Sequence, residues 1–213
     1  MAKTDFNCPG CGQPGSRESQ KRVCISKRPE LKEDIVSGTF FEWECPACGK
    51  RFFIDDVFLY NDDGRKFMVY YVPGFKKDAL EVPTAIKADE DYDTQHSVLR
   101  VASTFIDFVE KIRIFEERLD DRAIEAIKAV YAAAYREACG ASIYNMIFEE
   151  TAESGALCFA VFLQDEDFSV EIPDEAYRQT RSDFSSLFSE PGEKAFLRID
   201  QDWLAGVLGQ NDA

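Results

Sequence analysis

Short runs of aromatic and β-branched residues, separated by polar positions, dominate the first 73 residues of the chain. Partial alternation of this kind predicts strands, because successive side chains of a strand point to opposite faces. The sequence Asn-Asp-Asp-Gly at 61–64 predicts a hairpin turn. We therefore expect a mostly antiparallel β module over residues 1–73. Its predicted elements are strands at 21–25, 39–45, 51–60 and 66–73 and one helical turn at 29–36.

The pattern changes twice after residue 73. Residues 74–96 lack periodicity and contain Gly74, Pro83 and a run of acids, which predicts a linker or a surface loop. From Ser97 to about Leu119, apolar residues recur at helical spacing on one stripe, which predicts an amphipathic helix.

A second helix is expected directly after the first. Asp120 is a candidate N-cap, and Gly140 would end the helix. We expect the two helices of residues 97–140 to pack as a hairpin.

Residues 141–213 alternate between short apolar runs and polar turns. They predict three strands, at 143–150, 156–163 and 168–172, then a helix from Asp174 through Phe188 and a short last helix around Trp203. The expected fold class is α+β: a zinc-ribbon-like β module, a helical hairpin and a small α+β C-terminal unit at 141–213.

Two copies of one cysteine motif, CPGCG and CPACG, carry the clearest chemistry in the chain. Proline sets the backbone after the first cysteine of each pair, and glycine after the second can adopt the positive φ that points amides at sulfur. Two such turns facing each other form a tetrahedral four-thiolate cage. The predicted metal ligands are Cys8, Cys11, Cys45 and Cys48.

The identity of the metal has two alternatives. A closed four-thiolate site is typical of structural zinc, which helps to fold a small module. The doubled motif also resembles the ligand turns of rubredoxin, which implies an iron site that carries single electrons, shielded here by Trp43 and its neighbouring phenylalanines. We favour zinc, because rubredoxins are small independent proteins and this site is embedded in a longer chain.

Charge is distributed unevenly along the chain. Residues 1–60 carry nine basic and nine acidic residues, so the net charge of −15 belongs to the remainder. The acidic body disfavours nucleic acid and membrane surfaces and leaves a protein partner or a small ligand as the expected target, of which we favour the protein partner. The basic residues between Arg17 and Lys32 keep a nucleic-acid-binding ribbon open as a third alternative. No apolar run is long enough for a membrane span, and the free-cysteine pattern suits the cytoplasm.

We expect the other candidate residues to have structural roles. His96 is the only histidine, and we expect it to be exposed near a helix start. Asp120 and Asp121 resemble a catalytic pair of carboxylates, but acids at a helix start cap backbone amides. Cys24, Cys139 and Cys158 are expected to be buried thiols. No catalytic residue is predicted, and nothing in the sequence favours an enzyme.

The chain resembles the CpXC proteins, a bacterial family named after its two cysteine motifs. The resemblance rests on the paired CPxC turns, on PELKEDIVSGT between them and on EKIRIFEERLDDRAIE, and it extends from about Phe6 to Val130. It implies that the four motif cysteines are the hallmark residues of a presumed metal site, in a domain whose activity is not settled. The expected function is therefore a metal-binding protein-interaction or scaffolding module.

Overall fold

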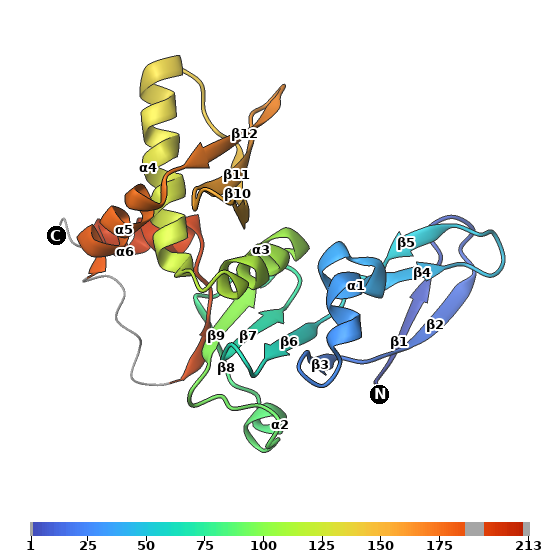
Figure 1. Ribbon diagram of the computed structural model, residues 1–213. Coiled ribbons are helices and arrows are strands. Elements are labelled where there is room, and N and C mark those ends of the chain that lie inside the picture. Colours follow the sequence, from blue (N-terminus) through green and yellow to red (C-terminus); the bar gives the residue numbers. More distant parts are fainter. Residues whose placement is uncertain (1, 186–193, 211–213) are drawn as a thin grey trace.

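A six-stranded sheet forms the centre of the molecule, in the order β3-β6-β7-β9-β13-β8 (Figure 1). The computed structural model describes residues 2–185 and 194–210. β6 and β7 form the hairpin that the Asn-Asp-Asp-Gly turn predicts, whereas β3 lies parallel to β6, and β9 lies parallel to β7 and β13. The strands are β3 (Arg22–Cys24), β6 (Phe58–Asp62), β7 (Phe67–Tyr71), β8 (Ala79–Glu81), β9 (Val98–Ala102) and β13 (Ala195–Leu197).

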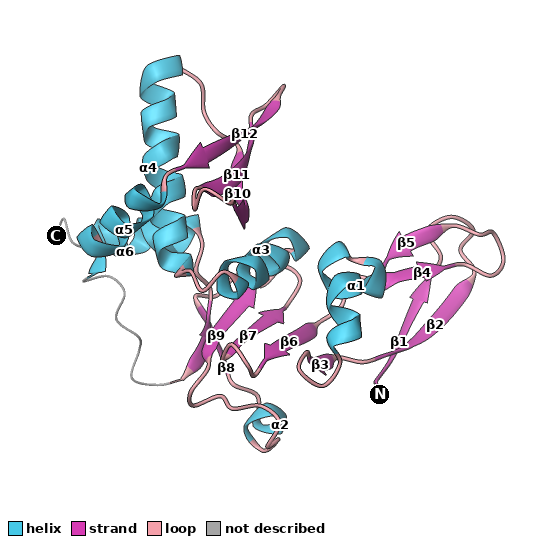
Figure 2. Ribbon diagram, in the orientation of Figure 1, coloured by secondary structure: helices cyan, strands magenta, loops and turns pink. Residues whose placement is uncertain are grey.

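Two small hairpins, β1-β2 and β4-β5, extend from one end of this sheet (Figure 2). Both are antiparallel, and β3 and a short helical segment lie between them along the chain. Gly38 ends α1 with a φ of +88°, a left-handed conformation that favours glycine. The elements are β1 (Ala2–Asn7), β2 (Pro14–Ser19), η1 (Pro29–Leu31), α1 (Lys32–Ser37), η2 (Thr39–Phe41), β4 (Glu42–Glu44) and β5 (Arg51–Phe53).

The second half of the chain adds a three-stranded antiparallel sheet, β10-β11-β12, and most of the helices. α4 lies next to this sheet and begins beside α3, and α5 and α6 lie near the lower part of α4 (Figure 1). The elements are α2 (Thr84–Lys87), α3 (Phe105–Glu116), α4 (Asp121–Cys139), β10 (Asn145–Thr151), β11 (Leu157–Phe162), β12 (Asp167–Ile172), α5 (Asp174–Asp183) and α6 (Gln201–Gln210).

One continuous core joins the two sheets, with α3 between them. Phe108 and Ile112 of α3 are fully buried and belong to the same apolar cluster as Val69 of the large sheet and Phe148 and Phe159 of the small one. The opposite face of the large sheet has a second, smaller apolar cluster, which contains Leu59, Met68, Leu99, Val101 and Phe196. α3 therefore holds the two halves of the chain together.

The structure corrects the predicted start of the first helix. Residues 98–102 form strand β9, and α3 begins only at Phe105, where the Thr104 side chain accepts a hydrogen bond from the amide of Asp107. β9 is a central strand with neighbours on both sides, so apolar residues point to both of its faces. A strand that is buried on both faces lacks a clear alternation of apolar and polar residues. The apolar residues of β9 therefore fitted the spacing expected for a helix.

Three further predictions need correction. Residues 2–7 and 14–19 form a hairpin that was not predicted, and residues 39–41 form a 3₁₀ turn instead of the start of a strand. The strand expected at 51–60 is two strands, interrupted at 54–57. The expected linker at 74–96 contains β8, an edge strand of the large sheet, and α2.

The three predicted strands of the C-terminal unit are confirmed, as are Asp120 as N-cap and Gly140 as the end of α4. Helices also form from Asp174 and around Trp203, but the first ends at Asp183, with Phe184 as its C-cap, before the predicted end at Phe188, which lies outside the described residues. β13, however, crosses back to pair with β8 and β9. The C-terminal segment is thus bonded to the central sheet.

Candidate metal centre

The two cysteine motifs form the tips of the β1-β2 and β4-β5 hairpins, and they fold in the same way. The amide of Gly12 donates to the carbonyl of Cys8, and the amide of Gly49 donates to the carbonyl of Cys45, each over 2.8 Å. The glycines have φ angles of +73° and +71°, which a side chain would disfavour. Each turn thereby presents two sulfurs from one tight loop.

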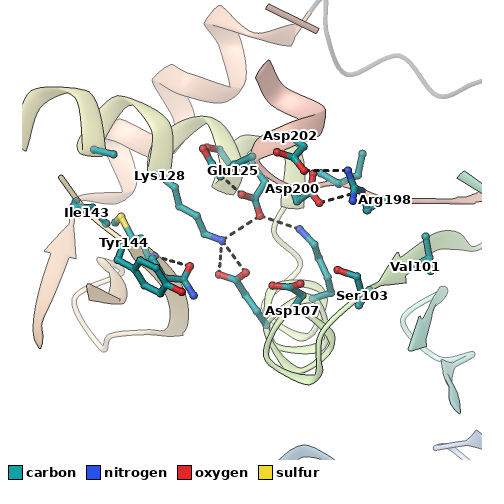
Figure 3. Close-up of a pocket in the computed structure, with 18 residues that line it drawn as sticks. Val101, Ser103, Asp107, Glu125, Lys128, Ile143, Tyr144, Arg198, Asp200 and Asp202 are labelled. Carbon is teal, nitrogen blue, oxygen red and sulfur yellow. Dashed lines mark hydrogen bonds and ion pairs between the residues drawn. The ribbon is translucent and has the colours of Figure 1, made fainter. Parts of the chain in front are cut away.

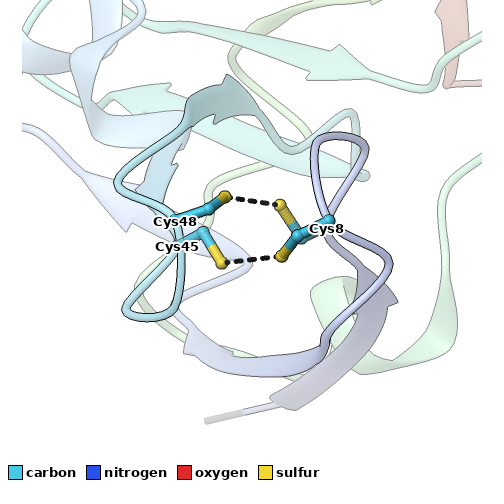
Figure 4. Close-up of side chains that lie close together, drawn as sticks. Cys8, Cys45 and Cys48 are labelled. Atoms are coloured by element: carbon cyan, nitrogen blue, oxygen red, sulfur yellow. Dashed lines mark hydrogen bonds between the residues drawn. The ribbon is translucent and has the colours of Figure 1, made fainter.

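The four sulfur atoms converge between the hairpins (Figure 4). They all lie within 4.8 Å of one another. The Sγ atoms of Cys8 and Cys48 are 3.7 Å apart, as are those of Cys11 and Cys45. Zinc–sulfur bonds of about 2.3 Å give a tetrahedron with an edge of about 3.8 Å. The spacing therefore fits one tetrahedral metal ion, and it is far too long for disulfide bonds.

The environment of Cys8 favours its thiolate. Cys8 is buried, which opposes ionisation, but the amides of Cys11 and Gly10 and the thiols of Cys45 and Cys48 lower the pKa of Cys8 to about 6. The amide of Gly10 donates to its sulfur over 3.4 Å. Metal ligation requires deprotonated sulfur, so this backbone geometry suits a cation.

Three aromatic rings join the two hairpins. Phe6 of β1 makes edge contacts with Trp43 of β4 and Phe52 of β5, with ring centroids 4.9 and 5.6 Å apart. Gly15 lies against them, because a Cβ there would be 2.7 Å from the Phe6 ring. The hairpins thus share only a small apolar core, and a metal ion would supply their main additional link.

The basic residues between Arg17 and Lys32 have partners within the chain. Lys21, Arg22, Lys27, Arg28 and Lys32 each form an ion pair with an acid. Two of these acids, Asp89 and Asp91, come from the loop after α2 and pair with Arg22 of β3 and with Lys27. The guanidinium of the remaining residue, Arg17, donates to the carbonyls of Phe40 and Glu42.

His96 is exposed, as the sequence predicts, but it lies just before strand β9 and not near a helix start. Its Nδ1 lies 2.9 and 3.0 Å from the two carboxylate oxygens of Asp93. Among the remaining cysteines, Cys24 is buried and Cys158 is half-buried, but Cys139 is exposed at the end of α4, which corrects the prediction for that thiol.

The Asp120–Asp121 pair has two structural roles. Asp120 caps α4 by accepting from the amide of Arg122, as predicted. Asp121 is fully buried and accepts from Nε and Nη2 of Arg100, at 2.8 and 3.0 Å. The two carboxylates therefore face different partners.

Sequence reasoning missed a buried ionic network that begins at Asp121 and links α3 to α4. Lys111 of α3 contacts Asp121 and Glu125 of α4, and Lys128 of α4 contacts Glu125 and Glu110. Its signal was the set of charges at 121, 125 and 128, which share a helix face with the apolar residues of α4. Buried charges of this kind are uncommon and often mark functional sites.

The fold and the thiol geometry together define an α+β protein with a zinc-ribbon-like module. The family model for the CpXC protein matches residues 6–128, more than half of the chain, so the protein belongs to the CpXC family. Comparison with curated proteins and with solved structures gave no significant match. None of the described helices combines the length and the apolar character needed to cross a membrane.

Proposed function

We propose that Cys8, Cys11, Cys45 and Cys48 hold one structural Zn²⁺ ion, and that the protein acts as an interaction or scaffolding module for a protein partner. The observation that carries the proposal is the approach of four thiols to within 4.8 Å, with 3.7 Å between Sγ atoms across the hairpins. Four protein sulfurs complete a tetrahedral shell, which is the arrangement of structural zinc sites.

The small core of the ribbon supports a structural role for the metal. Four ligands at the tips of two hairpins would join β1-β2 to β4-β5, which otherwise meet mainly through Phe6, Trp43 and Phe52. Structural zinc contributes on the order of 10 kcal/mol to the folding of comparable small modules. The metal would therefore stabilise the ribbon and leave its outer surface available to a partner.

Charge supports a protein partner over nucleic acid. Lys21, Arg22, Lys27, Arg28 and Lys32 already form ion pairs within the chain, and the net charge is −15. Phosphate binding needs cations that are free to replace counterions. None of the seven cysteines, all of which lie in the described part of the chain, forms a disulfide bond, which supports a reducing compartment such as the cytoplasm.

The test is metal analysis of protein purified without chelators or metal-affinity resin, together with an absorption spectrum. One zinc per chain and no visible colour would support the proposal. Iron with visible thiolate bands would replace it with the rubredoxin-like electron carrier.

Cysteine variants identify the ligands in the same assay. Cys45→Ser should lose the metal, whereas the control Cys139→Ser, which alters an exposed thiol of α4, should retain it. Metal retained in full by Cys45→Ser would refute the four-thiolate assignment.

A further inference from the structure

A cleft of about 290 Å³ opens on the side of the core that is formed by α3, α4, the start of β10 and the segment between β13 and α6 (Figure 3). It shares no residue with the thiol cluster. Its volume is at the lower end of the range of about 300–1,000 Å³ that is typical of ligand pockets. It is large enough for a small organic molecule.

The floor of the cleft is the buried ionic network between α3 and α4. Nζ of Lys128 lies 2.7 Å from Glu110 and 3.1 Å from Glu125, and Nζ of Lys111 lies 3.1 Å from Glu125. These four side chains are at most 8% exposed. The two positive and two negative charges of these side chains balance, so the buried network by itself does not require a further ion.

The wall beyond the floor carries unbalanced negative charge. Arg198 is shared by two carboxylates, with Nε 3.1 Å from Asp200 and Nη2 3.2 Å from Asp202. Asp107 adds another carboxylate, which no hydrogen bond or ion pair engages within the described part of the chain. Burial raises the pKa of Asp200, and the neighbouring charges of Asp202 and Glu125 contribute to the rise. In total the cleft is lined by five carboxylates and three cations.

The opposite side of the cleft is apolar and ends in an exposed aromatic ring. Ile143 and Met146 line this side together with Tyr144, which is 86% exposed. Figure 3 shows Ile143 and Tyr144 across the cleft from Arg198, Asp200 and Asp202. An exposed tyrosine ring at the mouth of an acidic cleft offers a face for stacking and for cation–π contact.

We propose that this cleft binds a small organic amine, whose ammonium group pairs with Asp107 and Asp200 and whose apolar body packs against Ile143 and Tyr144. The excess of carboxylates selects positive charge, and the apolar side selects an organic ligand. A bare divalent cation fits less well, because it needs several converging oxygens. Within the described residues, only the four cysteines come close enough together to hold a metal ion.

Three probes of nearly equal size distinguish the contribution of ligand charge to affinity from that of ligand shape. Titration with 2-phenylethylamine, 2-phenylethanol and 3-phenylpropanoate would be followed by amide chemical shifts in nitrogen-15 NMR spectra of the full metal-loaded chain. The amine should shift the amides of Tyr144 and Asp200 and bind at least about tenfold more tightly than the alcohol, as expected for charge-assisted contacts. The carboxylate should not bind. Absence of amine binding at millimolar concentration, or equal binding of amine and alcohol, would overturn the proposal.

Variants locate the contacts within the cleft. Asp107→Asn and Asp200→Asn should each weaken amine binding about tenfold. Asparagine at 200 retains a side-chain oxygen that can accept from the amide of Trp203, as Asp200 does. Tyr144→Ala should weaken binding by about two- to fivefold.

The control is Asp165→Asn in the exposed turn after β11, which changes net charge equally and should leave affinity unchanged. An equal loss of amine affinity in this control would show that binding depends only on the net charge of the protein, and it would refute the proposed site. A negative result here would not affect the zinc assignment, since the two sites have no residue in common.

Discussion

The ion pair between Arg100 and Asp121 offers the sharpest test of how the two halves of the protein are joined. Asp121 begins α4, and Arg100 lies on the face of β9 that α3 and α4 cover. Their side chains are 1% and 2% exposed, and Lys111 lies 3.4 Å from the same carboxylate. Asp121→Asn keeps the shape of the side chain but removes its charge.

The expected cost of Asp121→Asn is about 3–5 kcal/mol in the free energy of unfolding, because buried Arg100 and Lys111 lose the negative charge that they share, although Lys111 keeps its pair with Glu125. This is a large part of the stability of a typical domain, which is about 5–15 kcal/mol. Urea denaturation should show a lower midpoint with an unchanged slope. Adding Arg100→Met should recover part of the loss, since it removes one of the uncompensated charges.

The pH dependence of this variant provides a second readout. Burial opposes ionisation of Asp121, but the charges of Arg100 and Lys111 hold its pKa below the ordinary value. A lowered pKa stabilises the fold above the unfolded-state value, near 4, and this contribution disappears as the pH falls through the folded-state pKa. The stability difference between wild type and Asp121→Asn should therefore narrow below about pH 4.

The control is Asp91→Asn, which makes the same chemical change in a pair with Lys27 whose side chains are 51% and 57% exposed. Exposed ion pairs contribute little, so its unfolding midpoint should not change measurably. A loss below about 1 kcal/mol for Asp121→Asn, or an equal loss for Asp91→Asn, would refute the reasoning.

Two further predictions concern the metal site and the loop before β9. Chelation of the metal should increase amide hydrogen exchange in the two hairpins β1-β2 and β4-β5. Exchange in β6 and β7 should not change, because their side chains belong to the main core. An equal loss of protection in all of these strands would contradict the prediction. The His96 ring, followed by its backbone amide and Lys66, lowers the pKa of Asp93 to about 2. His96→Gln should raise this pKa in a carbon-13 NMR titration, and wild type should lose the associated stability between about pH 4 and pH 2. An unchanged titration of Asp93 would show that His96 is not the cause.

The thiol site was predictable from sequence because its geometry is largely local. Pro9 and Pro46 follow the first cysteine of each pair, and Gly12 and Gly49 adopt the positive φ that the turns require. The hairpin turn at Asn-Asp-Asp-Gly was predictable for the same reason, because its sequence is local. In each case the residues that determine the turn are adjacent in the chain, and the structure brings the two cysteine turns together as predicted.

Other features depended on contacts between distant parts of the chain, and only the tertiary structure decided them. Residues 98–102 form a strand because β7 and β13 lie on either side, and β13 comes from almost a hundred residues further along the chain. The acidic loop before β9 supplies Asp89 and Asp91, which pair with Arg22 and Lys27, and these partners lie more than sixty residues away in sequence. The acidic cleft likewise combines Asp107 of α3 with Tyr144 and Asp200. Local sequence determined the turns and the helix ends. The central strands, the ion pairs at the surface and the cleft depended on burial and charge pairing across the fold. The free energies of burial and of charge pairing depend on which distant residues become neighbours, so sequence alone did not determine these features.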